Sequence, residues 1–266
     1  MSRPYAEVIG DPIAHSRSPL IHNFWLAKLG IDAEYRATRV TRDDLPAYLA
    51  ARRADPAWRG CNVTMPLKVA ALAQVDIVEP HTSRIGATNC VHRLEGGLAA
   101  RNLDWGAVLD VLDPFERRGL SAVIVGSGGA ARAAVAAMDV WAADITIVAR
   151  DQVRGEALAE VAGRPITVVG LDHRPEADIL INATPLGMQG RADLELDLDA
   201  MPDGAIVLDM VYQPARTRLL ERASARGLGT VGGLAMLCSQ AAASFLAFFG
   251  KYPEDALVAA ARDLAK

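Results

Sequence analysis

The chain has 266 residues, enough for two domains or one large one, and 51% of its residues are hydrophobic. The formal net charge is −4 and no block of basic residues occurs, so nothing in the composition favours nucleic-acid binding. No apolar run approaches the ~18 residues of a membrane span and the N-terminus lacks a signal-peptide pattern, so we expect a cytoplasmic protein without membrane contact.

The first hundred residues alternate strand-like and helix-like segments, which predicts an α/β domain. Extended segments are expected at residues 6–9, 33–40, 60–64 and 87–92, followed by a hairpin turn at Gly96-Gly97. Helices are expected to begin at Ser18, near Asp43 and at Pro66. Ser18 is predicted to be the N-cap of the first helix, because Pro19 suits the first helical position.

A glycine-rich turn follows the apolar segment at residues 122–125 and precedes an Ala-rich helical pattern. The spacing Gly126-x-Gly128-x-x-Ala131 fits the dinucleotide-binding fingerprint, with Ala in the third place. Gly126 permits a sharp turn, Gly128 lets a pyrophosphate approach the backbone, and the helix N-terminus favours negative charge. An ordinary tight turn between a strand and a helix is the alternative interpretation.

The second half of the chain is typical of repeated βα units, with strands expected at residues 122–125, 145–148, 166–169, 179–182 and 206–209. This predicts a doubly wound parallel sheet with its ligand at the carboxyl ends of the strands. Residues 234–249 are apolar almost all round and predict a buried helix that ends at Gly250. Residues 254–264 predict a last amphipathic helix.

Metal chemistry is not expected, because no HExxH motif occurs and the cysteines lack metal-site or CxxC spacing. Cys61, Cys90 and Cys238 are predicted to be small buried residues with reduced thiols.

Six short motifs, in order along nearly the whole chain, resemble those of the shikimate dehydrogenase family; they lie at residues 10–23, 60–68, 86–89, 126–133, 181–188 and 232–240. The resemblance implies two α/β domains, a discontinuous substrate domain at 1–102 and 235–266 and a Rossmann-type NADP domain at 103–234. It also implies the reversible reduction of 3-dehydroshikimate to shikimate, a step of chorismate and aromatic amino acid biosynthesis.

Lys68 and Asp104 match the catalytic pair of the family, in which a lysine and an aspartate pass a proton to or from the reacting oxygen. Lys68 is expected in the first turn of a helix, where the dipole disfavours a cation. A solvated surface lysine and a helix-stabilising carboxylate are the ordinary alternatives for these two residues.

Seven residues match family positions that bind the substrate. These residues are Ser16, Ser18, Asn62, Thr64, Asn89, Tyr212 and Gln240. The two serines would hold the substrate carboxylate, the side-chain amides and the threonine would bind its hydroxyls, and the tyrosine would line the site. Ser18 and Thr64 could instead cap helices, and Asn89 could satisfy a turn. Ser16 has no such structural role in the sequence pattern, and Gln240 is a polar residue in an apolar helix that needs hydrogen-bond partners.

The cofactor residues implied by the resemblance lie in the turn, after the second strand of the Rossmann half and near the nicotinamide: Gly126, Gly128, Gly129, Ala130, Arg150, Arg154, Thr184, Met188, Gly233 and Met236. Arg150 and Arg154 favour NADP, since arginine suits the 2′-phosphate. Asp151 would put a negative charge near that phosphate, which leaves NAD possible, or it would be a helix N-cap.

The chain departs from the family beside the catalytic acid, where Asn102-Leu103-Asp104-Trp105 replaces the usual Asn-Thr-Asp-Gly. Leu103 removes a hydroxyl and Trp105 adds a large ring, and such a change can alter substrate discrimination. A paralogue acting on quinate or a related polyol acid, a non-catalytic nucleotide or metabolite sensor and a methyltransferase are the alternatives. We expect a small-molecule substrate, shikimate or a close analogue, and a monomer or homodimer.

Overall fold

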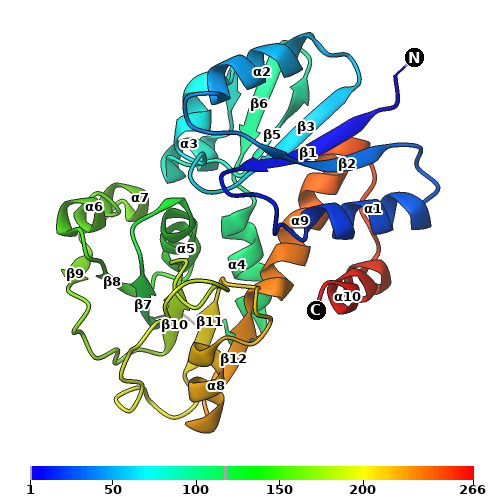
Figure 1. The fold of residues 1–266 in the computed structure, drawn as a ribbon. Coiled ribbons are helices and arrows are strands. Elements are labelled where there is room, and N and C mark those ends of the chain that lie inside the picture. The colour runs from blue at the N-terminus through cyan, green and yellow to red at the C-terminus, as the bar shows by residue number, and fades with distance from the viewer. Residues whose placement is uncertain (1, 117–118) are drawn as a thin grey trace. The chain divides into compact units, whose positions relative to one another are not determined.

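The structure is a computed structural model that describes residues 2–116 and 119–266 (Figure 1). The chain divides into two compact units. Unit 1 comprises Met1–Leu103 and Cys238–Lys266, and unit 2 comprises Asp104–Leu237. Within the described residues no helix is long and apolar enough to cross a membrane.

Unit 1 is built on a six-stranded mixed sheet with the strand order β2-β1-β3-β5-β6-β4. Its strands are β1 (Tyr5–Gly10), β2 (Glu34–Arg39), β3 (Trp58–Val63), β4 (Ile77–Val78), β5 (Cys90–Leu94) and β6 (Gly97–Arg101). β5 runs antiparallel to both of its neighbours, whereas the other pairings are parallel. The predicted hairpin is confirmed, because β5 and β6 pair antiparallel and Gly96 and Gly97 have φ of 96° and 143°.

Helices cover both faces of this sheet: α1 (Ser18–Lys28), α2 (Leu45–Ala54), α3 (Pro80–Ile85), α9 (Gly233–Phe249) and α10 (Asp255–Leu264). All six residues of β1 are buried, as a central strand requires, and α2 and α9 cover opposite faces (Figure 1). Trp25 of α1 is fully buried, and its Nε1 donates to the Leu257 carbonyl oxygen of α10 at 3.0 Å. The α9 and α10 helices confirm the prediction for the C-terminal residues, and Gly250, with φ of 70°, follows α9.

The helix expected to begin at Pro66 is wrong. Residues 65–69 form turns, and a short 3-10 helix follows at Ala70–Gln74. The Lys68 carbonyl oxygen accepts a hydrogen bond from the Thr88 amide at 2.8 Å, outside any helical pattern. Lys68 therefore does not lie in the first turn of a helix, and no helix dipole disfavours its charge there.

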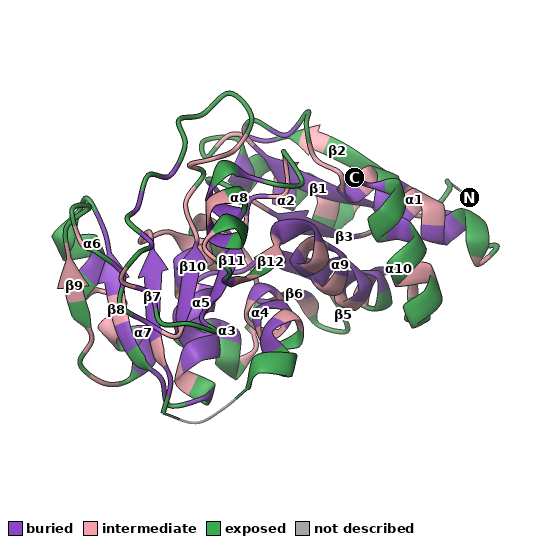
Figure 2. Ribbon diagram, turned by 90° about the horizontal axis from the view of Figure 1, so that it is seen from below, coloured by how far each residue is buried: buried purple, intermediate pink, exposed green. Residues whose placement is uncertain are grey.

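Unit 2 is a six-stranded parallel sheet in the order β12-β11-β10-β7-β8-β9, the strand order of a Rossmann fold. Its strands are β7 (Ser121–Val125), β8 (Asp144–Val148), β9 (Thr167–Val169), β10 (Ile179–Asn182), β11 (Ile206–Asp209) and β12 (Gly229–Gly232). Its helices are α4 (Asp104–Leu112), α5 (Gly129–Val140), α6 (Gln152–Glu156), α7 (Ala159–Ala162) and α8 (Arg218–Ala225). The inner strands β10 and β11 are buried throughout (Figure 2). The predicted parallel sheet is confirmed, and β12 is a sixth strand that was not predicted.

The expected helix after every strand is wrong at two connections, residues 170–178 and 183–205, which are irregular. Proline and glycine interrupt helical patterns at both places, for example at Pro175, Pro185 and Gly190. In the longer connection Leu194, Leu196, Leu198 and Met201 are buried in the core of unit 2, so these side chains cover the sheet in place of a helix.

Candidate active site

Polar and glycine residues of unit 2 follow its parallel strands at their carboxyl ends. Gly126 follows β7, Arg150 comes after β8, Thr184 after β10, Tyr212 after β11, and Gly233 directly after β12. Because the carboxyl ends of parallel strands lie at one edge of a sheet, these residues belong to the same edge. The sequence motifs of the predicted dinucleotide domain therefore meet where such sheets bind ligands.

The turn between β7 and α5 has the geometry of a pyrophosphate cradle. Gly126 has φ of 120°, and a Cβ atom there would lie 3.1 Å from Cγ2 of Thr184 and 3.2 Å from the Ala183 carbonyl oxygen. Gly128 precedes α5, and a Cβ there would meet nothing within 4 Å, so the backbone at this point is open to approach. The first amides of α5 have no acceptor within the helix. These residues fit a dinucleotide cofactor, with Gly129 and Ala130 in the first helical turn.

The residues after β8 are exposed and one of them has a capping role. Arg150 and Arg154 are both exposed. Asp151 is the N-cap of α6, and its Oδ1 accepts a hydrogen bond from the Arg154 amide at 3.1 Å. The N-cap alternative for Asp151 is thereby confirmed, and its carboxylate lies beside the arginines in the chain.

Three residues that the sequence analysis missed hold the loops after β10 and β11. Asn182 Oδ1 accepts from the hydroxyl and amide of Thr184, at 2.7 and 3.0 Å. The fully buried carboxylate of Asp209 accepts from Asn182 Nδ2 at 2.9 Å and from the Thr217 hydroxyl at 2.6 Å. Burial raises the pKa of Asp209, although these hydrogen bonds oppose the shift. In the sequence, Asp209 could have been recognised as a carboxylate at the end of an apolar strand.

The nicotinamide-side residues implied by the resemblance lie in the same unit. Gly187 has φ of 87°, and the Met188 amide donates to the Pro185 carbonyl oxygen at 3.3 Å. At Gly233 an added Cβ would collide with the Met210 carbonyl oxygen, so only glycine fits. Met236 is buried in α9.

Three side-chain amides come together in unit 1. Asn62 and Asn89 lie on neighbouring strands or their ends, and both donate through Nδ2 to Oε1 of Gln240 on α9, at 3.4 and 3.3 Å. Asn62 Nδ2 also lies 3.3 Å from the Asn89 carbonyl oxygen, and Asn89 Oδ1 accepts from the Leu103 amide at 2.7 Å. All three amides are buried. The family motifs assign all three residues to the substrate site, and in the structure they form one hydrogen-bond network.

Two further residues of this network were missed from the sequence. Asn62 Oδ1 accepts a hydrogen bond of 2.6 Å from the Tyr35 hydroxyl and has the Ser244 hydroxyl at 3.2 Å. Tyr35 and Ser244 are both buried. Ser244 lies in an apolar helix, and Tyr35 lies between the charged residues Glu34 and Arg36 of β2, so neither position gave a local signal of a role in the site.

The paired serines lie at the start of α1. Arg17, not Ser18, is the N-cap, so the predicted N-cap is wrong; the backbone of Arg17 already has helical dihedral angles, φ −81° and ψ −9°. Ser18 is the first helical residue, and its amide donates to Ser16 Oγ at 3.3 Å. Ser16 therefore has a structural contact that its sequence position did not reveal.

Thr64 and Lys68 lie in the turn after β3. The Thr64 amide donates to the Ile9 carbonyl oxygen at 2.9 Å, and the Thr64 carbonyl oxygen accepts from Leu67 at 2.9 Å. Thr64 therefore does not begin an α-helix, and Lys68 is half-buried in the same turn. In unit 2, Asp104 is the buried first residue of α4, and the half-buried Trp105 follows it.

The three cysteines are buried, as predicted, and none is in a disulfide. Within the part of the chain that the structure describes, no three His, Cys, Asp or Glu side chains are grouped to hold a metal ion.

Comparison with known proteins gives consistent matches. Residues 8–91 match the family model of the shikimate dehydrogenase substrate binding domain. The NADP-dependent shikimate dehydrogenase of Sphingopyxis alaskensis is 47% identical over 255 residues, which cover 95% of this chain and 93% of that protein. Shikimate 5-dehydrogenase of Thermus thermophilus, solved in complex with NADP(H) and shikimate, superposes with a TM-score of 0.88 at 36% identity, covering 99% of this chain and 100% of that one. The 5-ketofructose reductase of a Gluconobacter species has a TM-score of 0.86 at 28% identity, with 100% of both chains covered.

Proposed function

This chain belongs to the shikimate dehydrogenase family, and we propose from this premise that it interconverts 3-dehydroshikimate and shikimate with NADP(H). The observation that carries the proposal is 47% identity to an NADP-dependent shikimate dehydrogenase over a match that spans both units. The enzyme is thus an NADP oxidoreductase with a Rossmann fold, and its reaction belongs to the shikimate pathway.

We assign the substrate to unit 1 and NADP to unit 2. The cofactor would lie along the carboxyl edge of the unit 2 sheet, with its pyrophosphate at Gly126, Gly128 and the start of α5. Arg150 and Arg154 would bind the 2′-phosphate, and Thr184, Met188, Gly233 and Met236 the nicotinamide end. When bound, the reduced cofactor supplies a hydride to the carbonyl carbon of the substrate.

Lys68 and Asp104 would move the proton. In the reduction direction, the Lys68 ammonium would donate a proton to the carbonyl oxygen of the substrate, which becomes the alcohol. The Asp104 carboxylate would be the second proton-handling group of the pair. In the oxidation direction, Lys68 accepts the proton of the alcohol.

The remaining side chains would orient the substrate. Ser16 and Ser18 lie beside the N-terminus of α1, which favours the substrate carboxylate. Asn89 and Gln240 offer amide groups to ring hydroxyls, and Thr64 and Tyr212 complete the set. Fixing the reacting carbon in this way lowers the entropic cost of hydride transfer.

The test is spectrophotometric, with shikimate or quinate and each oxidised cofactor, followed at 340 nm. We expect reduction of NADP+ by shikimate, and Lys68→Ala should lower kcat by about 10²–10⁴-fold while the fold is retained. A folded protein that binds NADP+ but oxidises neither acid would refute the proposal and favour the sensor.

A second candidate function is the oxidation of quinate or a related polyol acid. Leu103 and Trp105 flank Asp104, and a protein with this fold is a 5-ketofructose reductase, so the fold also serves another substrate. A substrate panel separates the two, because equal or better turnover of shikimate would refute the second. We further propose a cytoplasmic monomer or homodimer, which sizing of the purified protein would distinguish.

A further inference from the structure

The amide network of unit 1 fixes which way Gln240 faces. The Leu103 amide can only donate, so the atom of Asn89 that it contacts must be the oxygen, and Nδ2 of Asn89 faces Gln240. The Asn89 carbonyl oxygen can only accept, so the atom of Asn62 that it contacts must be Nδ2, which also faces Gln240. Two backbone groups therefore require independently that Gln240 turn its oxygen toward the protein.

With Oε1 held by two donors, the group that Gln240 can offer to a ligand is its NH2. The same logic limits Asn62, because its Nδ2 already donates to Gln240 and to the Asn89 carbonyl oxygen. Its Oδ1 accepts from Tyr35 and lies within reach of Ser244. An amide has two donor hydrogens and two acceptor lone pairs. Protein groups meet both hydrogens and one lone pair of Asn62, and its second lone pair faces the Ser244 hydroxyl, whose single proton also reaches the Ala241 carbonyl oxygen at 3.0 Å.

We propose that Asn62 is a positioning residue rather than a substrate-binding residue, and that the Tyr35 hydroxyl holds its side chain in place and through it presents the Gln240 NH2 to a substrate hydroxyl. This rests on the proposed function. It changes the role that the family resemblance gave to Asn62, and it adds Tyr35 to the groups that determine substrate affinity.

Tyr35 is held firmly enough for this role. Asn23 of α1 clamps its backbone through two bonds, accepting from the Tyr35 amide at 2.9 Å and donating to the Tyr35 carbonyl oxygen at 2.8 Å. Tyr35 is 2% exposed, and its phenol ring lies flat against the His22 ring, with centroids 3.9 Å apart. Burial raises the pKa of the Tyr35 hydroxyl well above its ordinary value, so it remains a donor.

The first test compares two tyrosine variants that lose the same kind of bond. Tyr35→Phe keeps the ring and removes the hydroxyl, and we expect kcat/KM for shikimate to fall about tenfold, chiefly through KM, with the KM for NADP+ unchanged. Tyr5→Phe is the control, since Tyr5 is also a buried residue and its hydroxyl also makes a 2.6 Å bond, to Asp55, within unit 1. It should leave kcat/KM unchanged.

The second test uses Asn62→Asp and a pH profile. An ionised carboxylate would turn an acceptor toward the Asn89 carbonyl oxygen and Gln240 Oε1, whereas a protonated one restores a donor. The ratio of kcat/KM for this variant to that of wild type should therefore rise as pH falls from about 8 to about 6. A residue that only packed, or that contacted substrate through an acceptor, would not give this dependence.

The inference and the proposed function fail differently. If wild type does not oxidise shikimate with NADP+, the function is wrong. If wild type is active and Tyr35→Phe matches it, or if Tyr35→Phe and Tyr5→Phe lose stability alike without a change in shikimate KM, the positioning role is wrong. A flat ratio for Asn62→Asp across pH would also overturn it.

Discussion

The imidazole ring of His22 lies parallel to the phenol ring of Tyr35, with 3.9 Å between centroids and 9° between planes. His22 is fully buried, and neither of its ring nitrogens has a hydrogen-bond partner within residues 2–116 and 119–266. Burial lowers the pKa of His22 to about 3. The ring is therefore neutral in the folded protein at neutral pH, and charging it opposes folding.

The first prediction concerns acid stability. The unfolded chain binds the His22 proton near its ordinary pKa of about 6.5, whereas the folded chain does so only near 3. Between these values the unfolded state holds more protons, so the free energy of unfolding falls as pH falls, by about 3 kcal/mol at about pH 4.5. His22→Phe keeps an aromatic ring beside Tyr35 and should lose less stability on acidification than wild type. Urea unfolding at about pH 7 and about pH 4.5 measures this loss.

The exposed His81 supplies the control for this comparison. His81→Gln should follow the wild-type acid profile. If His22→Phe loses as much stability between pH 7 and 4.5 as wild type, the buried neutral histidine is not a source of acid sensitivity.

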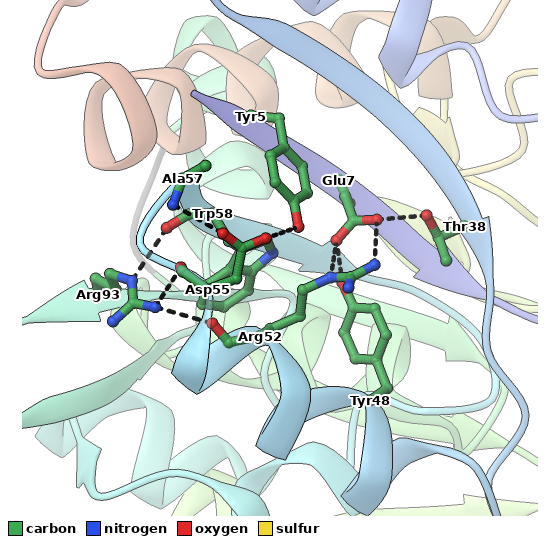
Figure 3. Close-up of polar contacts among 9 residues, drawn as sticks. All are labelled: Tyr5, Glu7, Thr38, Tyr48, Arg52, Asp55, Ala57, Trp58 and Arg93. Atoms are coloured by element: carbon green, nitrogen blue, oxygen red, sulfur yellow. Dashed lines mark hydrogen bonds and ion pairs between the residues drawn. The ribbon is translucent and has the colours of Figure 1, made fainter. Parts of the chain in front are cut away.

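The second prediction concerns the buried carboxylate of Glu7. It accepts from the hydroxyls of Thr38 and Tyr48, at 2.5 and 2.6 Å, and from Arg52 Nε at 2.7 Å (Figure 3). Burial raises the pKa of Glu7, but these hydrogen bonds outweigh it and hold the pKa below its ordinary value. The ionised Glu7 carboxylate therefore stabilises the folded protein at pH values above the ordinary carboxyl pKa. This stabilisation is lost as the pH falls through the lower pKa that Glu7 has in the folded protein.

Glu7→Gln should lower the free energy of unfolding by about 3–5 kcal/mol at neutral pH, since it leaves Arg52 without its charged partner. Chemical unfolding measures this loss. The cluster contacts α2, on the sheet face opposite α9, so kcat/KM of the folded variant should equal that of wild type (Figure 1). A large loss of activity in a folded sample would show that the two faces are coupled.

The third prediction concerns Asp209, which joins the loops that follow β10 and β11. Asp209→Ala removes the acceptor of Asn182, Thr217 and the Val211 amide. These donors hold the loops that carry Thr184 and Tyr212, so the KM for NADP+ should rise about tenfold or more. Calorimetry with NADP+ checks the affinity directly.

Asp178 is the matched control, because it lies just before β10, at the amino edge of the same sheet, and accepts from the amide and hydroxyl of Ser121. Asp178→Ala should lower stability without changing the KM for NADP+. Equal effects of both variants on NADP+ affinity would indicate a general loss of fold rather than loss of loop support.

Local patterns predicted the elements whose burial is continuous. Residues 179–182 are uniformly apolar up to Asn182, and the strand has those bounds. β12 was not predicted because Gly229-Thr-Val-Gly232 is short and has glycine at both ends. It forms a strand through its pairing with β11. Tertiary pairing decided that element, and no local pattern carries such information.

In the candidate site, too, some residues could be predicted from the local sequence and others only from tertiary contacts. Gln240 was recognisable as a polar residue in an apolar helix that needed partners. Its partners Asn62 and Asn89 lie 178 and 151 positions away in sequence, and family motifs, not local chemistry, grouped them. Tyr35 belonged to no motif, because its role arises only when β2 and β3 bring its hydroxyl to Asn62.

The fourth prediction concerns cofactor preference. Arg150 is exposed after β8, where the 2′-phosphate of NADP would lie, and a charge-assisted bond to phosphate contributes about 1.5–3 kcal/mol. Arg150→Ala should therefore lower the ratio of kcat/KM for NADP+ to that for NAD+ by about 10–100-fold. Steady-state rates with both cofactors at saturating shikimate measure the ratio.

Asp151→Ser is the complementary change. Serine retains the N-cap bond to the Arg154 amide, so α6 should keep its stability, while the negative charge beside the phosphate is lost. The NADP+ preference should rise by about two- to fivefold at low salt, and the gain should shrink as ionic strength screens the exposed charge. If the NADP+ preference of Asp151→Ser is unchanged at low salt, the Asp151 carboxylate only caps α6. It then does not weaken the binding of the 2′-phosphate by Arg150 and Arg154.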